Sequence, residues 1–530
     1  MSQPQSKAES SRSLSEQAEK WVLVTAILAS SMAFIDSSAL RTALPRMQLD
    51  LNISGGQLVW VENAYTLLLS ALILLGGSLG DHYGRKRVFG IGIGIFTAAS
   101  LLCGLAPTVE VLIAARGLQG IGGALMVPGS LALISALVAP ERRGRAIGTW
   151  STFSTATTLF GPALGGFLTD NGLWRGVFFI NIPLAAIALY ALITYVPENK
   201  DPNAPRQLDY IGGLLITLGL AGLTVGFTLA PERGLVDALV LAMLLGGLVF
   251  TIAFFINEAR SDHPMMPLRL FKSRTFAGTN ALTLLLYAAL GALPFFVGLN
   301  LQQVQGYSAT FAGLTMLPLG IMLTLMSRWA GGLVDRVGAR LPLTIGPAIA
   351  GLGFLMFAFP GLTGGESDYW LTFLPPSLVL GFGMGITVAP LTTAVMGSAP
   401  AESAGTASGI NNAVARTASV LAIATLGALS LVVFSGNLQS RTADLGLSAE
   451  TSAALETEAS KLAGAEIPEG ATPEQAGAIR GAVQWAFIDT FRLVAVICAV
   501  LAWGSALLGW LLVEGKTTPV RRAEVAVRTE

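Results

Sequence analysis

The chain has 530 residues, of which 53% are hydrophobic and 12% are charged, with a further 61 glycines. A soluble protein carries roughly 25% charged residues, so the composition excludes an ordinary soluble enzyme and a disordered protein. Lys and Arg together number 32, as do Asp and Glu, so the net charge is zero and indicates no nucleic-acid partner. These numbers are typical of a protein that lies in a lipid bilayer.

The chain is poor in residues that bind metals or form disulfides. The two cysteines, Cys103 and Cys498, lie in apolar runs, and the two histidines, His82 and His263, are isolated. A metal site or a disulfide framework needs more ligands at closer spacing. The phosphate loop of an ATP-driven pump, Gly-x-x-x-x-Gly-Lys-Ser/Thr, is also missing from the sequence. We therefore expect no metal, no cofactor and no enzymatic activity.

Apolar runs of membrane-spanning length occur along the whole chain. A transmembrane helix needs about 20 mostly apolar residues. In chain order, the predicted spans lie at 21–43, 57–79, 86–106, 110–133, 146–169, 175–196, 209–230, 235–257, 275–300, 309–334, 341–361, 370–397, 404–435 and 484–513. The sequence thus predicts an all-α membrane protein with 14 transmembrane helices.

The spans group into two six-helix halves separated by a two-helix insert. The predicted parts are a tail at 1–20, an N-terminal half at 21–197, the insert at 208–258, a C-terminal half at 275–513 and a tail at 514–530. The segments on the side of both tails hold 21 Lys and Arg, against six on the other side. Because positive loops stay inside, both termini are predicted to be cytoplasmic, in a multi-pass inner-membrane protein.

Two capping patterns and one long loop refine this topology. Ser54 to Gln57 and Thr472 to Gln475 match the capping box, so helices are predicted to begin just after Ser54 and near residue 473. The segment 436–483 is the long external loop, with a net charge of −4 and many Ala and Glu residues. It is interpreted as a solvated, partly helical cap, and a role in substrate gating is the alternative.

A short motif occurs twice, 254 residues apart, each time at the end of the second helix of a half. Such duplication is typical of secondary transporters with two related halves. The residues of the two copies are Gly77, Asp81, Gly84, Arg85, Lys86, Asp335 and Arg336.

With these motifs together, the chain resembles the major facilitator superfamily, and within it the 14-helix drug/proton antiporter branch. The segment 77–86 matches the superfamily's loop signature, and 112–122 matches its fourth-helix motif. The resemblance implies that the loop and its second copy form an inner latch, which breaks when the inner side opens. The segments 34–45 and 174–183 resemble motifs of the first and sixth helices of that branch. The helix-five antiporter motif is carried by Gly161, Pro162, Gly165 and Gly166, although Thr157 stands where that motif usually begins with glycine.

The resemblance implies a proton-driven exporter of hydrophobic, often cationic, drugs that works by alternating access, with multidrug efflux and antibiotic resistance as its physiological role. The helix-five residues would form a bendable packing seam, since Pro162 removes one helical hydrogen bond and glycines allow close approach; ordinary small-residue packing is the alternative. Where the branch usually has asparagine in its first-helix motif, this chain has Arg41. Arg41 is expected to extend to the outer interface, and contact with the substrate is the alternative.

Three ionisable residues on helices one, two and four are predicted to share one depth. At about 1.5 Å of rise per residue, Asp36 and Glu62 lie about 8 Å and Arg116 about 9 Å below the outer face. A cation between two carboxylates keeps one ionised and leaves the other able to bind a proton. We therefore predict proton coupling by Asp36, Glu62 and Arg116: Asp36 is the first candidate for the coupling acid, Glu62 is a second acid or a cation-recognition site, and Arg116 tunes both. A static ion pair that joins three helices is the alternative.

The substrate cavity should be largely apolar, with a few polar groups. Candidates are Tyr65, Tyr287, Asn411, Asn412 and Arg416, although Arg416 could instead satisfy helix carbonyls. Two other functions remain open: a proton-coupled exporter of an endogenous lipid or metabolite, and a non-transporting membrane sensor or scaffold, which would need no buried acid. The expected partners are the lipid bilayer, protons and a small hydrophobic substrate, and the sequence leaves open whether a periplasmic adaptor takes part.

Overall fold

The computed structural model describes residues 16–199, 209–331, 333–399 and 404–515, so most of both predicted tails lies outside the described residues. Helices are the only regular secondary structure within these ranges. Eleven helical segments of this part of the chain are long and apolar enough to cross a membrane, compared with the fourteen that the sequence predicts. The all-helical membrane class is therefore confirmed.

The chain forms two compact units, which we describe separately. Unit 1 comprises Met1–Gly222, Leu245–Met265 and Ser308–Leu314, and the remaining residues make up unit 2. Unit 1 contains α1 (Glu16–Leu51), α2 (Gly55–Tyr83), α3 (Arg85–Leu105), α4 (Val109–Leu137), α5 (Pro140–Asp170), α6 (Gly176–Phe179), α7 (Asn181–Tyr195), α11 (Ala309–Leu314) and parts of α8 (Tyr210–Arg233) and α9 (Ala238–Arg260).

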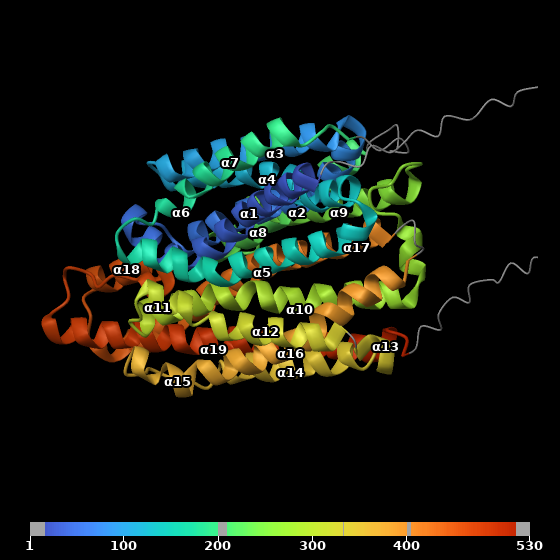
Figure 1. Ribbon diagram of the computed structural model, residues 1–530. Helices are drawn as coiled ribbons and strands as arrows, with labels where there is room; N and C mark the ends of the chain where they lie inside the picture. Colours follow the sequence, from blue (N-terminus) through green and yellow to red (C-terminus); the bar gives the residue numbers. More distant parts are fainter. Residues whose placement is uncertain (1–15, 200–208, 332, 400–403, 516–530) are drawn as a thin grey trace, which may run out of the picture. The chain divides into compact units, whose positions relative to one another are not determined.

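Within unit 1, α1 and α4 are the central helices. α1 packs on α4, α5 and α7, while α4 also packs on α2 and α3. In Figure 1, α3, α4 and α7 lie side by side in the same unit. Residues on these contact faces are buried, among them Met32, Leu40, Phe96 and Leu112. This packing places the middle of α1 inside protein, away from lipid.

Unit 2 is built around α16 and α19. α12 and α14 pack on α16, and α10, α14 and α17 pack on α19. Apart from the parts of α8 and α9, its elements are η1 (Leu268–Lys272), α10 (Arg274–Leu299), η2 (Asn300–Val304), α12 (Leu317–Gly331), α13 (Leu333–Val337), α14 (Pro342–Met356), η3 (Glu366–Asp368), α15 (Tyr369–Thr372), α16 (Leu374–Gly397), α17 (Ala404–Thr442), η5 (Ala443–Leu445), α18 (Ala449–Glu458), η6 (Ala459–Gly464) and α19 (Pro473–Leu512).

Both predicted capping boxes are present. The side chain of Ser54 accepts a hydrogen bond from the amide of Gln57, and the Gln57 side chain accepts one from the Ser54 amide. Thr472 and Gln475 make the same pair of bonds, with Pro473 at the first helical position of α19. The prediction that the last helix begins near residue 473 is confirmed.

Several predicted spans are interrupted. The predicted helix at 309–334 consists of α11 and α12, with a break between them, followed by α13. α10 ends in the π-helical turn η2, after which Gln305 donates to the carbonyl of Gly361 and accepts from Thr363. Such turns arise where a helix accommodates an extra residue, and the apolar pattern of the sequence does not reveal them.

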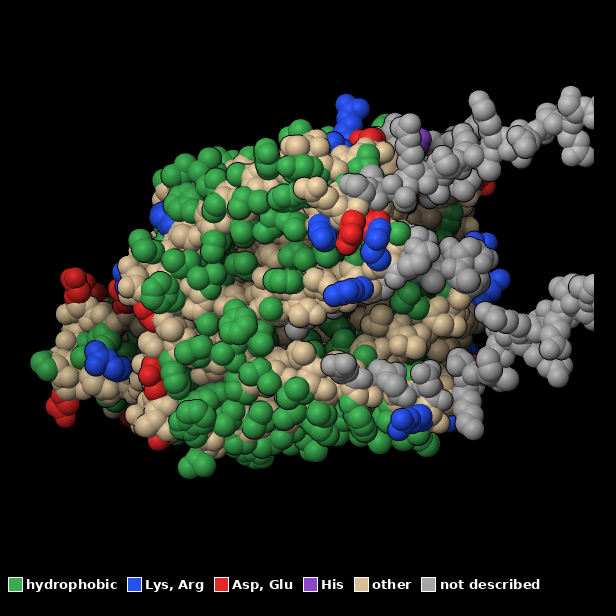
Figure 2. All heavy atoms as spheres, viewed as in Figure 1, with side chains coloured by type: hydrophobic (Ala, Val, Ile, Leu, Met, Phe, Trp, Pro, Cys, Tyr) green, Lys and Arg blue, Asp and Glu red, His purple; other side chains and the backbone are tan. Residues whose placement is uncertain are grey.

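The long loop at 436–483, which the sequence predicts to be external, is shorter and more helical in the structure. α17 continues to Thr442 and α19 starts at Pro473, so the loop at 436–483 contracts to residues 443–472. Its partly helical character is confirmed by α18 and η6, and η6 packs on α17 and α19. Acidic side chains gather in the region of α18 in Figure 2.

The outer sides of the helices are largely apolar. On the face shown in Figure 2, hydrophobic side chains cover the sides of the helices, and charged side chains gather near helix ends. Exposed apolar residues are frequent on α9 and α19, among them Leu245, Val249, Ile252, Val500 and Leu507. A water-soluble protein would not expose so much apolar surface, so these flanks are suited to contact with acyl chains.

Candidate functional site

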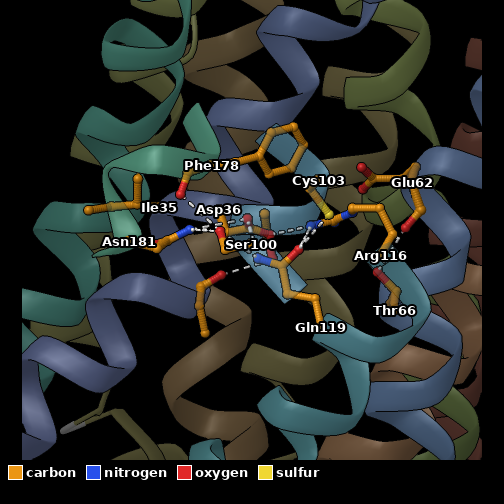
Figure 3. Close-up of polar contacts among 12 residues, drawn as sticks. Ile35, Asp36, Glu62, Thr66, Ser100, Cys103, Arg116, Gln119, Phe178 and Asn181 are labelled. Carbon is orange, nitrogen blue, oxygen red and sulfur yellow. Dashed lines mark hydrogen bonds and ion pairs between the residues drawn. The ribbon is translucent and has the colours of Figure 1, made fainter. Parts of the chain in front are cut away.

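The centre of unit 1 contains a fully buried ion pair (Figure 3). Oδ2 of Asp36 on α1 accepts a hydrogen bond from Nη1 of Arg116 on α4 at 2.5 Å. The side chain of Asp36 is 0% exposed and that of Arg116 is 1% exposed. Either charge alone at this burial would cost several kcal/mol, so the pairing explains how both spans tolerate a charge.

Side-chain amides complete the coordination of Asp36. Its Oδ1 accepts from Nε2 of Gln119 at 2.7 Å and from Nδ2 of Asn181 at 3.5 Å. Gln119 follows Arg116 by one helical turn and accepts from its Nη1 at 2.7 Å. Asn181 also donates to the hydroxyl of Ser100 on α3 at 2.9 Å. Both oxygens of the Asp36 carboxylate are thus engaged by donors.

The sequence did not identify these amides as site residues. Gln119 and Asn181 lie in the segments 112–122 and 174–183, which carry the family resemblance, but they had been assigned no role. Their signal was available, since an uncharged amide within an apolar span needs a hydrogen-bonding partner. Ser100 gave no such signal, because the spans contain many hydroxyl residues that bond only to their own helix.

Arg116 is held on its other side by α2. Its Nε donates to the carbonyl of Val61 at 3.2 Å, and its guanidinium lies 4.6 Å from the centre of the Tyr65 ring. Tyr65, predicted to line a cavity, is 2% exposed and contacts Arg116 instead. A cation above an aromatic face in a dry site is stabilised by about 2 kcal/mol.

Glu62 forms a second ion pair, with Arg41. Nε and Nη2 of Arg41 each lie 2.9 Å from Oε1 of Glu62. The side chain of Glu62 is 3% exposed and that of Arg41 is 31% exposed. Arg41 was expected to extend to the outer interface, and the structure shows that its guanidinium pairs with the acid on α2. Its place relative to the membrane surface stays a prediction.

This second pair changes the charge of the site. Asp36, Glu62 and Arg116 alone would carry a net charge of −1 when both acids are ionised. Arg41 adds one positive charge, so the four side chains sum to zero. Glu62 also interacts electrostatically with Arg116, which connects the two pairs. The site is therefore a neutral cluster of four charges, not an acidic one.

The repeated loop motif is bound to the end of α7 in unit 1. Gly84 has a φ of +112° between α2 and α3. Oε1 of Glu198 accepts from the amide of Lys86 at 3.1 Å, and the amide of Arg85 donates to the carbonyl of Asn199 at 2.8 Å. A Cβ at position 84 would lie 2.6 Å from Oε1 of Glu198. Glycine is therefore required here by both the backbone and the contact.

The remaining latch residues are placed only in part. The side chains of Asp81 and Asp335 lie outside the described residues. Gly77 lies in α2, where a Cβ would be 3.7 Å from Pro128 of α4. Arg336 is exposed on α13 of unit 2. The pairing expected of an inner latch therefore stays a prediction.

One side of the helix-five motif packs against α1. A Cβ at Gly161 would lie 1.9 Å from Oγ of Ser38, and a Cβ at Gly165 would lie 2.3 Å from the carbonyl oxygen of Ala39. Real Cβ atoms do not approach other atoms so closely, so any larger residue would force α1 and α5 apart. The two glycines are four residues apart and thus lie on one face of α5.

The other side of the same motif packs against α11. A Cβ at Gly166 would lie 2.2 Å from a carbonyl oxygen of α11, and one at Gly313 would lie 2.2 Å from the carbonyl oxygen of Pro162. At the end of α5, the carboxylate of Asp170 accepts hydrogen bonds from the amides of Ala309 and Thr310 at 2.9 and 2.8 Å. The motif is thus a seam with a helix on each side.

The other cavity candidates lie in unit 2, on α10 and α17. Nδ2 of Asn411 donates to Oγ1 of Thr283 at 2.7 Å, which joins the two helices. Tyr287 is half-buried on α10, and its carbonyl accepts from a serine of α17. Asn412 is exposed and Arg416 is half-buried on α17, one helical turn apart. These side chains are polar groups on otherwise apolar helices.

Comparison of the sequence with known protein families identifies the family of this chain. Residues 26–423 match the pattern of the family described as the Major Facilitator Superfamily. The match includes the Asp36 cluster, the loop motif and the helix-five seam. The chain belongs to the major facilitator superfamily. The resemblance inferred from the motifs is therefore confirmed, and this protein is a multi-pass membrane transporter.

Other members of the superfamily are similar along most of the chain. The protein is 35% identical over 410 residues to the multidrug resistance protein Stp of Mycobacterium tuberculosis, covering 77% of this chain and 75% of that protein. It is 30% identical over 501 residues to the tetracenomycin C resistance and export protein of Streptomyces glaucescens, covering 93% and 91% of the two chains.

The solved structures give the same fold. A bacterial homolog of the human lysosomal transporter Spinster, in an inward-facing and unoccupied conformation, matches with a TM-score of 0.64 at 18% identity. The match covers 95% of this chain and all of that one. In this member of the superfamily, the cluster places two buried carboxylates, Asp36 and Glu62, beside two arginines.

Proposed function

We propose that the protein is a proton-coupled antiporter that exports hydrophobic, often cationic, drugs or toxic compounds across the cytoplasmic membrane. The observation that carries this proposal is the buried cluster of Asp36, Glu62, Arg41 and Arg116. Four charges in the membrane-spanning part of one unit are costly, and a carrier of protons has a use for them. The names of its relatives, which refer to multidrug resistance and antibiotic export, support the drug as substrate.

The charge of the cluster supplies the coupling. With both acids ionised the cluster is neutral, so an approaching cationic or neutral drug meets no net repulsion. One bound proton makes the cluster +1, which opposes a cation in a low-dielectric site. Protons that enter from outside would then favour release of the drug outward. The proton gradient would be the only energy source, with no cofactor.

The motifs would supply the moving parts. In alternating access, the two predicted six-helix halves rock about a central site. The glycine seam of α5 lets its neighbours pack at backbone contact, which suits a tight closed state. The loop at 77–86 would latch the inner side, with Asp81 and Asp335 in the role of the acids. Tyr287, Asn411, Asn412 and Arg416 would give the drug polar contacts.

We further propose fourteen membrane crossings with both termini in the cytoplasm. Beyond the eleven segments long and apolar enough to span, three helices of suitable place in the chain support this number: α2, α5 and the shorter α14. The excess of Lys and Arg in the predicted inner loops supports the orientation. A periplasmic adaptor is not required by this proposal.

The test is efflux of ethidium, a lipophilic cation, from cells that express the protein. We expect export that stops when an uncoupler collapses the proton gradient, and that is lost in Asp36→Asn when the amount of folded protein is matched to that of the wild type. Export that continues with the uncoupler present would overturn proton coupling. If ethidium and a panel of drugs are not exported but an endogenous lipid or metabolite is, the substrate class is wrong and the mechanism is retained.

A further inference from the structure

The two buried acids of the cluster differ in how their oxygens are engaged. Oδ2 of Asp36 accepts from Arg116, and its Oδ1 accepts from Gln119 and Asn181. In Glu62, one oxygen takes both bonds from Arg41, whereas Oε2 is buried and has no hydrogen-bond partner in the described part of the chain. Figure 3 shows the carboxylate of Glu62 apart from the amide network around Asp36.

This difference decides which acid can take a proton at low cost. A proton added to Asp36 would bind an oxygen that already accepts hydrogen bonds and would weaken its ion pair with Arg116. A proton added to Oε2 of Glu62 competes with no donor on that oxygen. A buried carboxylate oxygen without a partner is itself unfavourable, so protonation of Glu62 neutralises a charge that no donor stabilises at Oε2.

The charged groups around Glu62 come from three helices. Arg41 of α1 binds it directly, and Arg116 of α4 interacts with it electrostatically, while Asp36 offsets the charge of Arg116. α3 contributes Cys103, whose thiol contacts Gln119. Arg116 is fixed by its buried partners, but Arg41 is 31% exposed. Arg41 is therefore the group whose removal changes the charge next to Glu62 with the least damage to the fold.

We propose that Oε2 of Glu62 is where this transporter binds its coupling proton, and that Arg41 is the positioning residue that sets the pH at which it binds. Asp36 then stays ionised and anchors Arg116. This proposal deepens the proposed function and rests on it, because only the proposed function links this proton to transport. The proton comes from external water, resides on Oε2 without breaking any covalent bond in the protein, and leaves to water on the inner side.

Infrared difference spectroscopy of the purified protein in lipid tests this directly, because it detects the carbonyl stretch of a protonated carboxyl group and needs no substrate. The protein is titrated from about pH 9 to about pH 4 as wild type, E62Q, D36N, R41A and R41K. We expect a buried carboxyl band that is lost in E62Q and retained in D36N. Because an adjacent cation opposes protonation by about one to three pH units, R41A should move the midpoint upward by at least one unit, and R41K should restore it.

A band that persists in E62Q, or that is lost in D36N instead, overturns the assignment of Glu62. A midpoint that is the same in wild type and R41A overturns the role of Arg41. If E62Q proves unstable, the titrations of R41A, R41K and D36N still decide the assignment: the midpoint should shift in R41A, return in R41K, and the band should remain in D36N. The spectroscopic result stands apart from transport: expected spectra with uncoupler-insensitive ethidium export would defeat the proposed function and leave Glu62 as a protonation site.

Discussion

Replacement of Asp36 and of Glu62 by the isosteric amide should lower the free energy of unfolding by very different amounts. Asp36→Asn leaves Arg116, whose side chain is 1% exposed, without a carboxylate partner and with neutral acceptors such as the Val61 carbonyl and Gln119. Breaking a buried pair from one side costs about 3–5 kcal/mol, because the remaining charge has no access to water. We expect Asp36→Asn to lower the free energy of unfolding by that amount.

Glu62→Gln is the matched control in the same cluster. It also removes one carboxylate from an arginine, but Arg41 is 31% exposed and can turn toward water or headgroups. The arginine that remains is therefore solvated like a member of an exposed ion pair, which contributes about 1 kcal/mol or less. The two substitutions should therefore differ by at least about 2 kcal/mol, in favour of the Glu62 variant.

Unfolding can be followed with a thiol-reactive dye. Cys103 and Cys498 are both 0% exposed, one in each unit, so they react only when the fold opens. Titration with sodium dodecyl sulfate in mixed micelles, read by this dye, gives the change in free energy. Equal losses in the two variants would refute the reasoning. The double variant Asp36→Asn with Arg116→Gln should recover part of the loss, since no buried charge remains.

Three other substitutions test the remaining contacts. Gly165→Ala would press a methyl group onto the α1 backbone and should cost about 1–3 kcal/mol in the same unfolding assay, whereas Gly148→Ala on the same helix, where a Cβ meets nothing within 4 Å, should be neutral or stabilising. Asp170→Ala removes the acceptor for two amides of α11 and should cost about 0.5–2 kcal/mol of stability. If Asp170→Asn leaves the free energy of unfolding unchanged, the charge of Asp170 is not needed for this contact. Gly84→Ala should reduce the yield of folded protein, through its φ of +112° and its contact with Glu198; a normal yield would show that the loop can shift.

The depth of the ionisable residues could be predicted from the sequence, because helical rise alone fixes it. That reasoning placed Asp36 and Arg116 at one level, and the structure shows them paired. Rotation about the helix axis and the direction of long side chains could not be predicted in this way. Arg41 was therefore assigned to the interface, although it reaches Glu62, and the orphan Oε2 that distinguishes the two acids is visible only in the structure.

The presence of the helices could be predicted from the sequence, but most of their ends and interruptions could not. The caps at Ser54 and Thr472 could be identified because two side-chain bonds at fixed spacing define them. The length of α17 could not, since a helix that continues into water loses its apolar pattern without ending. The break between α11 and α12 likewise lies within an apolar run. The apolar pattern of the sequence indicates which segments lie in lipid, whereas the positions of helix breaks depend on tertiary packing.

Proteoliposomes test the central claim most directly, because they contain no other transporter and no ATP. The purified protein is reconstituted, a pH gradient is imposed by dilution, and ethidium movement is followed by fluorescence. We expect ethidium transport against the direction of proton flow, at a rate that rises with the gradient. This transport should stop when an uncoupler is added and should be absent in Glu62→Gln. Ethidium transport at the same rate with and without the gradient would contradict it.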